Sequence, residues 1–544
     1  MLLARAPANP RVRKAVVKAT PVQAPVGGWD AASALANMPA DRAVQLKNWF
    51  PQPGWIEVRK GFKFHSWDIT SDTTPIESLM VYQGPTSAKM FAAGGGKVYD
   101  ATANAAATSS ITGLSEDRWQ HTMFGNSAGT FLWMCNGADT PRYYNGSSWT
   151  NTSITGTGIT STDFIQCWAH KARIWCVINS SQDAAYLETD AISGTATKFR
   201  LGRLFTRGGY LMAGTTWTRD GGSGPDDYQV FISSEGQVAV YAGTDPASAD
   251  TWSIVGVFNV PKPIGRRCFA RLGGDVLLMT LEGVFPLSQL LPVDQSKASR
   301  VAITEKIDAA FNAAALSYGS LFGWEMAVYS AGTRLIVNIP TDELESSKQY
   351  VMNTITGAWC EYDAHNANCW AVMGDEIYFG GQNGAVYRAD TGRSDGDQPI
   401  VAVGQTAYQA FGGANVKRFS MLRPLVNTTG TNRPSLGMSV DFVETSSMST
   451  LTAAQAASGA LWDVAKWDVA TWSDESVTVA DWTNVVGIGT FGSVKFQAIT
   501  GQDVGRSLWG VSLWGRSLWG GTGSTDEAMR INGFVALTEA GGYL

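Results

Sequence analysis

The stretch "FISSEGQVAVY", residues 231–241, predicts the repeating unit of the fold. An apolar strand end leads into a tight turn that ends in glycine, and alternating apolar residues follow. This pattern is typical of a β-hairpin, because its turn needs a positive φ that glycine adopts without strain. The same pattern occurs in "FAAGGGKVYDA" (91–101), "LMTLEGVFPL" (278–287) and "YFGGQNGAVYRA" (378–389).

The spacing of the turn glycines predicts a β-propeller. Gly96, Gly236, Gly283 and Gly384 are separated by 140, 47 and 101 residues. These gaps are close to three, one and two multiples of a repeat of about 47–50 residues, which is the length of a four-stranded propeller blade.

Three further stretches lie near the missing multiples. Gly146 in "RYYNGSSW" and Gly332 in "VYSAGTRLIV" fit two of them, and "VINSSQDAAY", which starts at Val177, lies near the third. The spacing therefore predicts seven blades, with six as the alternative.

The composition agrees with an all-β protein. Charged residues make up 16% of the 544 residues, whereas glycine occurs 59 times and tryptophan 21 times. After residue 400, "VKRFSMLRPLVNTTG" (416–430) reads as a longer strand without the blade pattern. We therefore expect a basic arm and docking segment at 1–60, a propeller at 61–400 and a C-terminal β domain with Trp-repeat loops at 401–544.

The N-terminus has an unusual charge distribution. Its first 29 residues include no acidic side chain and five basic ones, Arg5, Arg11, Arg13, Lys14 and Lys18. Together with four prolines, they predict an extended arm. The arm is either a solvated tail or a segment that docks on a partner, and the sequence leaves open whether that partner is protein or DNA.

Two segments repeat tryptophan every five residues. The stretches are "LWDVAKWDVATW" (461–472) and "RSLWGVSLWGRSLWGG" (506–521), and their repeated residues are Trp462, Trp467, Trp472, Trp509, Trp514 and Trp519. A spacing of five fits neither a strand nor a helix. The tryptophans either pack on one another in a loop or anchor a subunit or spike interface, where tryptophan is enriched.

The sequence contains no recognisable catalytic or cofactor motif. The four histidines are isolated, and the six cysteines include no C-x-x-C pair. Asp220, Asp226 and Asp227 in "RDGGSGPDDY" are weak candidates for a metal site, and a solvated turn is the competing interpretation. We therefore expect a protein that is not an enzyme, binds no cofactor and has no membrane-spanning segment.

Three long stretches resemble structural proteins of tailed bacteriophages. They are "GGWDAASALANMPADRAVQLKNWFPQPGWIEVRKGF" (27–62), "DYQVFISSEGQVAVYAGTDPASADTWSIVGVFNVPKPIGRRC" (227–268) and "NTITGAWCEYDAHNANCWAVMGDEIYFGGQNGAVYRADTG" (353–392). The "KRFSMLRP" and Trp-repeat region is similar to the end of the same family. Within this family, the sequence most resembles the tail nozzle protein of short-tailed phages, also called the packaged-DNA stabilisation or tail tubular protein.

The resemblance implies a propeller-containing subunit in a hexameric ring of the virion tail. The ring would lie below the portal or adaptor proteins, carry tail fibres or spikes, and pass phage DNA without sequence-specific binding. A net charge of −6 suits a wall along which DNA slides, because basic side chains on phosphates strengthen binding. Assembly would take place in the host cytoplasm. The alternatives are a propeller-based glycan hydrolase and a host receptor-binding tail protein.

Overall fold

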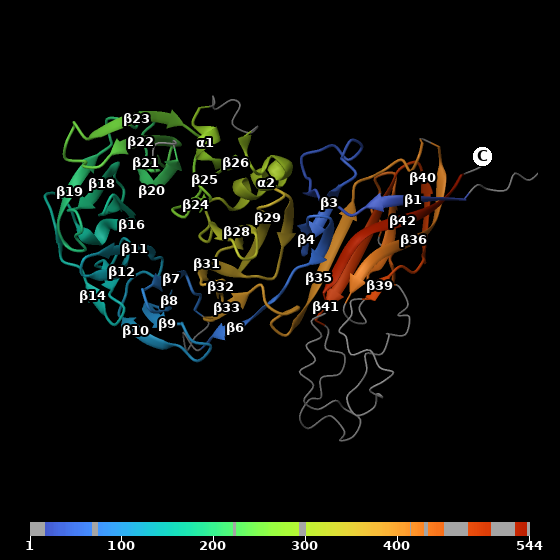
Figure 1. The fold of residues 1–544 in the computed structure, drawn as a ribbon, viewed down its shortest axis with the longest axis horizontal. Helices are drawn as coiled ribbons and strands as arrows, with labels where there is room; N and C mark the ends of the chain where they lie inside the picture. Colours follow the sequence, from blue (N-terminus) through green and yellow to red (C-terminus); the bar gives the residue numbers. More distant parts are fainter. Residues whose placement is uncertain are drawn as a thin grey trace, which may run out of the picture.

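The computed structural model describes residues 17–67, 74–220, 225–292, 301–413, 415–428, 433–445, 447–450, 477–501 and 528–540. The structure is all-β, with 56% strand and 5% helix. It contains a β-propeller of about five blades and further β-sheets. Figure 1 shows the propeller as the rounded part at the left and the other sheets at the right. The predicted all-β propeller class is confirmed.

The first three blades are separate sheets of mainly antiparallel strands. The first has β7 (Ser78–Gln83), β8 (Ala88–Gly94), β9 (Lys97–Asp100) and β10 (Thr108–Thr112). The second has β11 (Gln120–Asn126), β12 (Gly129–Cys135), β13 (Arg142–Tyr144) and β14 (Trp149–Asn151). The third has β15 (Ile154–Thr155), β16 (Phe164–His170), β17 (Arg173–Ile178), β18 (Asp183–Leu187) and β19 (Gly194–Arg200).

The next two blades continue in chain order. The fourth has β20 (Leu211–Asp220), β21 (Pro225–Ser233), β22 (Gln237–Gly243) and β23 (Trp252–Asn259). The fifth has β24 (Phe269–Leu272), β25 (Asp275–Thr280) and β26 (Gly283–Pro286), followed by α1 (Leu287–Leu290) and α2 (Asp308–Tyr318). Apolar clusters fill the space between neighbouring blades, so the sheets pack face to face.

Two more four-stranded groups belong to a 15-stranded sheet instead. One is β27 (Glu325–Tyr329), β28 (Arg334–Asp342), β29 (Ser346–Asn353) and β30 (Trp359–Tyr362). The other is β31 (Ala367–Met373), β32 (Glu376–Gly381), β33 (Val386–Ala389) and β6 (Phe62–Ser66). The prediction of seven separate blades differs from the five that the structure shows, because these two groups join strands of the neighbouring sheets.

The remainder of the 15-stranded sheet joins early and late parts of the chain. Its other strands are β2 (Gly28–Trp29), β3 (Arg42–Lys47), β34 (Ser394–Asp395), β35 (Gln398–Thr406), β37 (Ser435–Val440), β38 (Ser449–Thr450) and β41 (Gly492–Thr500). β3 pairs with both β30 and β35, so an N-terminal strand connects the propeller side to the C-terminal side.

A seven-stranded sheet lies at the other side of the C-terminal domain. Its strands are β1 (Val17–Gln23), β4 (Trp49–Gln52), β5 (Trp55–Val58), β36 (Lys417–Thr428), β39 (Val477–Val479), β40 (Thr483–Gly489) and β42 (Met529–Ala540). The first and last strands, β1 and β42, pair along seven residues. Strands from the ranges 1–60 and 401–544 therefore share sheets.

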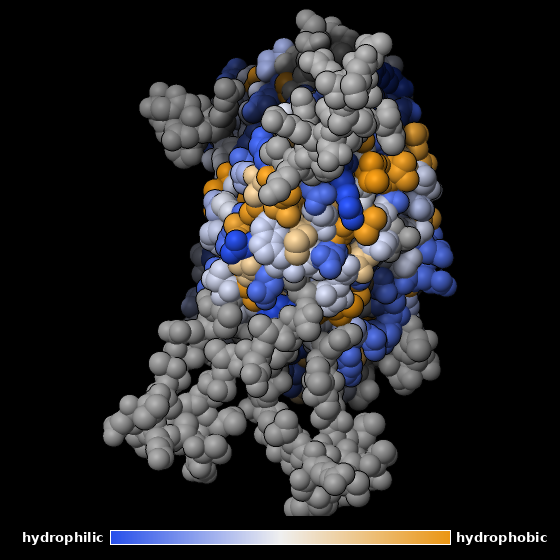
Figure 2. Space-filling view, turned by 90° about the vertical axis from the view of Figure 1, so that its right-hand side faces the viewer, coloured by the Kyte–Doolittle hydropathy of each residue, from blue (hydrophilic) through white to orange (hydrophobic). Residues whose placement is uncertain are grey.

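Figure 2 views this end of the molecule, where hydrophobic and hydrophilic residues are intermingled on the coloured part of the surface. The outward face of β40 includes two exposed apolar side chains, Val486 at 90% and Ile488 at 70%. The inward-facing residues of β36, such as Phe419 and Leu422, are buried in the domain core. Buried and exposed residues alternate as expected of a sheet with one solvated face, but these two outward residues are apolar where polar ones are usual.

The hairpin glycines behave as predicted in most places. Gly96, Gly236, Gly283 and Gly384 all have a positive φ. Gly332 is an exception, because the left-handed position in its turn is taken by Thr333, with φ of 52°.

A buried ion pair lies between the propeller side and the C-terminal side. The Arg59 side chain is 0% exposed, and its two terminal nitrogens donate to the two Asp395 carboxylate oxygens at 2.8 and 2.6 Å. Its Nε donates to Oδ1 of Asn48 at 2.8 Å, and Nη2 donates to the backbone oxygen of Asp363 at 2.9 Å. One guanidinium thus joins the chain after β5, the loop after β30 and β34.

Candidate functional site

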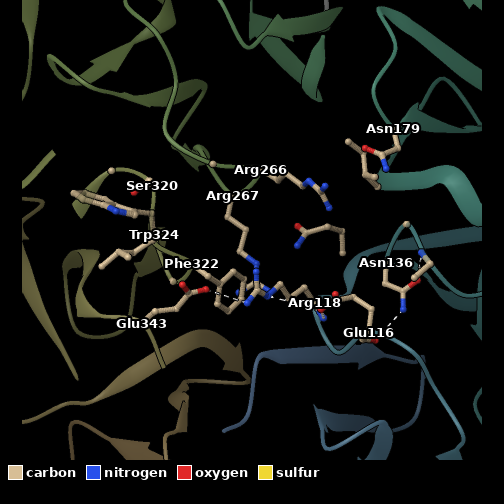
Figure 3. Close-up of a pocket in the computed structure, with 18 residues that line it drawn as sticks. Glu116, Arg118, Asn136, Asn179, Arg266, Arg267, Ser320, Phe322, Trp324 and Glu343 are labelled. Carbon is tan, nitrogen blue, oxygen red and sulfur yellow. Dashed lines mark hydrogen bonds and ion pairs between the residues drawn. The ribbon is translucent and has the colours of Figure 1, made fainter. Parts of the chain in front are cut away.

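The axis of the propeller contains three consecutive cavities of about 460, 150 and 380 Å³. The largest and the middle cavity share Gln120, Arg266 and Arg267. The middle and the third share His121, Phe269 and Met326 among their lining residues. The cavities therefore form a continuous space that the first strands of the blades surround. We take the largest cavity, at one mouth of this axis, as the candidate functional site (Figure 3).

Arg118, just before β11, is held by carboxylates at this mouth. Its Nε donates to Glu77 at 2.8 Å, and its Nη2 donates to Glu343 at 3.2 Å. The guanidinium also lies over the ring of Phe322, 4.2 Å from the ring centre. These contacts fix the side chain against one wall of the cavity.

Arg267, just before β24, is held still more firmly. Its Nη1 forms an ion pair with Glu325 at 3.2 Å. Its Nη2 donates to Oγ of Ser78 at 2.9 Å and to the backbone oxygen of Glu77 at 3.1 Å. Burial raises the pKa of Glu325, and the charge of Arg267 opposes that rise. The charges of Arg118 and Arg267 are therefore both compensated.

Arg266 differs from these two arginines. Its half-buried side chain extends into the cavity, away from Phe322 (Figure 3). Among the described residues, its guanidinium makes no hydrogen bond or ion pair. Burial lowers the pKa of Arg266 from its ordinary value, although arginine remains charged at neutral pH.

His121 on β11 lines the middle and far cavities. Much of its surface is open to the axial space, yet protein surrounds that space, so the ring is poorly solvated. Burial lowers the pKa of His121 to about 4, and the positive charge of Arg267 adds to the effect. The imidazole is therefore neutral at pH 7 and adds no charge to the axis.

The far mouth contains Arg271 and, on the adjoining blades, a Lys171–Asp227 ion pair of 3.0 Å. Burial opposes ionisation of Asp227, but hydrogen bonds from Thr218 and Lys171 outweigh it and lower its pKa. Asp227, one of the three aspartates considered for a metal, is thus held by a hydroxyl and an ammonium.

Asp220 and Asp226 lie near one another on the paired strands β20 and β21, where their neighbours in register are Pro225 and Arg219. Within the described ranges, no group of three or more His, Cys, Asp or Glu side chains could hold a metal ion. In the same ranges, no helix has the length and apolar character needed to cross a membrane.

The predicted interface tryptophans, Trp462, Trp467, Trp472, Trp509, Trp514 and Trp519, lie outside the described residues. The strands that follow the two Trp segments can be placed, because Val477 of β39 and Met529 of β42 both pair with Thr428. The strands that begin after the two segments, β39 and β42, therefore both start beside Thr428. That convergence was not visible in the sequence.

Of the predicted arm residues, Arg5, Arg11, Arg13 and Lys14 also lie outside the described residues. Lys18 is exposed on β1, opposite Thr538 of β42, and its backbone oxygen accepts a hydrogen bond from the Thr538 hydroxyl. The end of the predicted arm is thus a strand of the C-terminal domain.

Sequence reasoning did not identify the axial arginines. Arg266 and Arg267 are adjacent in "GRRC", within one of the stretches quoted above, whereas Arg118 lies some 150 positions earlier. Adjacent arginines in a glycine-containing loop before a predicted strand were a usable signal. Only the ring of blades, however, brings the loop before β24 next to the loop before β11.

No protein-family model matches the chain, and no curated protein is similar to it. Solved structures that resemble it are propellers. YCF48 bound to D1 peptide has 10% identity and a TM-score of 0.37, and the match covers 65% of this chain and 99% of that one. The WD40 propeller domain of Doa1 has 8% identity and a TM-score of 0.37, with 61% and 97% covered. BamB from Moraxella catarrhalis has 11% identity and a TM-score of 0.33, with 63% and 92% covered. These similarities are remote, and we draw no functional conclusion from them.

Proposed function

We propose that this chain is a structural subunit of a short-tailed phage tail, a nozzle protein that assembles into a hexameric ring below the portal or adaptor. The ring retains packaged DNA and conducts it at ejection. The proposal begins from the sequence resemblance to tail structural proteins. The observation that supports it best is the way the propeller and the C-terminal domain are joined.

The joint is extensive and buried. Strands of both parts hydrogen-bond within one 15-stranded sheet, and the buried Arg59–Asp395 pair lies between them. Such a joint resists relative motion, since bending it would expose unpaired strand edges and a buried charge. A rigid two-part subunit suits a component of a pressurised particle.

The chemistry of the axis favours a structural role over the hydrolase alternative. Glycoside hydrolysis usually needs two carboxyl groups free to act as acid and as base or nucleophile. Here Glu77 and Glu343 bind Arg118, and Glu325 binds Arg267. Burial raises the pKa of Glu325, as a general acid requires, but Glu77 and Glu343 are held in ion pairs and do not supply the free second carboxyl group that the reaction needs.

The strands that begin after the two Trp segments support an assembly role for these segments. Both strands start beside Thr428. We assign the six repeated tryptophans to a subunit or spike contact, and the basic N-terminal residues to a docking arm.

We also infer that the propeller ring is completed by the two four-stranded groups of the large sheet, which gives seven blades in total. β27 contacts β24 and β31, and β31 contacts β7 of the first blade. β6, from the N-terminal side, closes the last group by pairing with β33. An experimental density map of the protein checks the count, and a gap between β31 and β7 would contradict it.

The experiment that tests the function is the copy number of this chain per purified virus particle, measured by quantitative mass spectrometry against the major capsid protein. About six copies are expected for a nozzle ring. Twelve copies would move the chain to the adaptor layer, and eighteen would indicate trimeric spikes. Absence from particles would overturn the proposal, and loss of a host polysaccharide on incubation with the protein would favour the hydrolase.

A further inference from the structure

The three arginines that line the cavity at the axial mouth differ in whether a carboxylate binds them. Arg118 and Arg267 are bound by Glu77, Glu343 and Glu325 and lie over Phe322. The guanidinium of Arg266, the third arginine of this cavity, has no such partner among the described residues. A half-buried guanidinium keeps its charge at neutral pH, so it attracts an anion from solution.

The walls around Arg266 add hydrogen-bond donors. Asn179 lies across the cavity from Arg266 (Figure 3), and Gln120 also lines the cavity. Among the described residues, the side-chain NH₂ groups of Asn179 and Gln120 donate no hydrogen bond. A guanidinium and two free amide groups thus surround one volume of about 460 Å³. Pockets of roughly 300–1,000 Å³ are typical of small-molecule sites.

We propose that this cavity binds a small ligand that carries an oxyanion, either a carboxylate or a phosphate. Arg266 forms the ion pair with the oxyanion, since its planar fork matches two oxygen atoms. Asn179 and Gln120 donate hydrogen bonds to oxygen atoms elsewhere on the ligand. None of the tryptophans assigned to subunit or spike contacts is part of this site, so either proposal can fail without the other.

The chain offers a matched control at the opposite mouth of the axis. Arg271 lines the far cavity and likewise makes no hydrogen bond or ion pair among the described residues. Each arginine has a carboxylate nearby that raises its pKa against the lowering effect of burial, Glu116 for Arg266 and Asp227 for Arg271. Replacing either arginine by glutamine removes one positive charge from the axis and keeps a side chain of comparable polarity.

The test is isothermal titration calorimetry of the full chain at low ionic strength with three probes: glucuronate, inorganic phosphate and uncharged glucose. We expect one anion to bind with one site per chain and glucose to bind at least tenfold more weakly than that anion. Arg266→Gln should weaken the anion at least tenfold, whereas Arg271→Gln should change it less than twofold. Tighter binding of glucuronate identifies a carboxylate ligand, and tighter binding of phosphate identifies a phosphorylated one.

Three results would overturn the proposal: no binding of either anion, equal binding of glucose and glucuronate, or unchanged anion affinity in Arg266→Gln. A thermal unfolding curve of each variant shows that the protein is folded. If Arg266→Gln proves unfolded, Asn179→Ala replaces it, with the same tenfold weakening expected. Ring assembly of Arg266→Gln should equal that of the unmodified chain, which distinguishes this site from the nozzle function.

Discussion

Single buried side chains set much of the stability of this protein. Arg59 and Asp395 bury opposite charges in a two-pronged ion pair at the joint between the two parts of the molecule. His170 on β16 is buried as a neutral ring, with Nδ1 3.1 Å from the hydroxyl of Thr216. In both cases the folded state has removed a titratable group from water, so its charge state is linked to folding.

Breaking the Arg59–Asp395 pair should destabilise the protein strongly. Asp395→Asn leaves the fully buried guanidinium with only the partly exposed Asp363, 4.0 Å away, as a counter-charge, and we expect a loss of about 3–5 kcal/mol in the free energy of unfolding. Denaturant unfolding measures it. The control is Lys89→Gln, which removes an ion pair with Asp100 in which both side chains are partly exposed, and which should cost less than about 1 kcal/mol. Equal losses in the two variants would contradict the role of burial.

Acidification should destabilise the protein through His170. Burial lowers the pKa of His170 to about 4, and the positive charge of Lys171 adds to this effect. The unfolded chain takes up its proton near pH 6.5, so this histidine's contribution is complete above pH 6.5 and is lost as pH falls towards 4. The loss approaches about 3 kcal/mol on linkage arithmetic.

The measurement is denaturant unfolding at several pH values between 7 and 4, for the unmodified chain and for His170→Gln. The variant should lose less stability over this range, because glutamine does not titrate. Parallel pH profiles for the two proteins would show that His170 does not contribute.

At the scale of elements, tight hairpin turns set the register of the blades. Gly236, between β21 and β22, has φ of 75°, and a Cβ at that position would collide with the backbone oxygen of Val260. Gly273, between β24 and β25, has φ of 61°, and a Cβ there would meet nothing within 4 Å. Substitution of Gly273 therefore tests the cost of the left-handed backbone alone, whereas substitution of Gly236 tests that cost together with a steric collision.

Gly273→Ala should cost about 1–2 kcal/mol, the usual penalty for an L-residue in the left-handed region. Gly236→Ala should cost more, since Val260 must also move and its backbone belongs to the loop after β23. Thermal and denaturant unfolding of both variants give the comparison. An equal cost would mean that the loop at Val260 yields freely.

At the scale of the whole molecule, the two parts depend on each other. The apolar core of the C-terminal domain includes Tyr362 and Phe379 from the propeller side together with Phe496 and Phe534 from the C-terminal side. A fragment comprising residues 61–400 alone would lack Phe496 and Phe534, and also the strand β3 that pairs with β30 and β35. Burial of such aromatic side chains contributes on the order of 2 kcal/mol each.

We therefore expect the 61–400 fragment to aggregate, or to unfold at a clearly lower temperature than the full chain. Size-exclusion chromatography and differential scanning calorimetry test this, and the full chain should show one main unfolding transition. A monodisperse fragment with the melting temperature of the full chain would show that the propeller folds independently.

The sequence was sufficient for the local and repetitive features of this fold. Alternating apolar residues and turn glycines act over a few positions, so hairpins such as 231–241 and the propeller class could be predicted. The prediction for the turn at Gly332 was partly wrong, because Thr333 takes the left-handed conformation there. Neighbouring residues compete for such a position, and packing selects between them.

Features that depend on distant pairing could not be predicted. The sequence does not show that β1 pairs with β42, that β3 joins β30 to β35, or that Arg118 lies in one cavity with Arg266. Hydrophobic periodicity shows which face of a strand is buried, but many partners satisfy the same pattern. Burial then determines which charges are paired, as at Arg59, and which remain free to bind a ligand, as at Arg266. The tertiary structure alone makes that distinction, because the cost of an unpaired charge depends on the water that the surrounding fold removes.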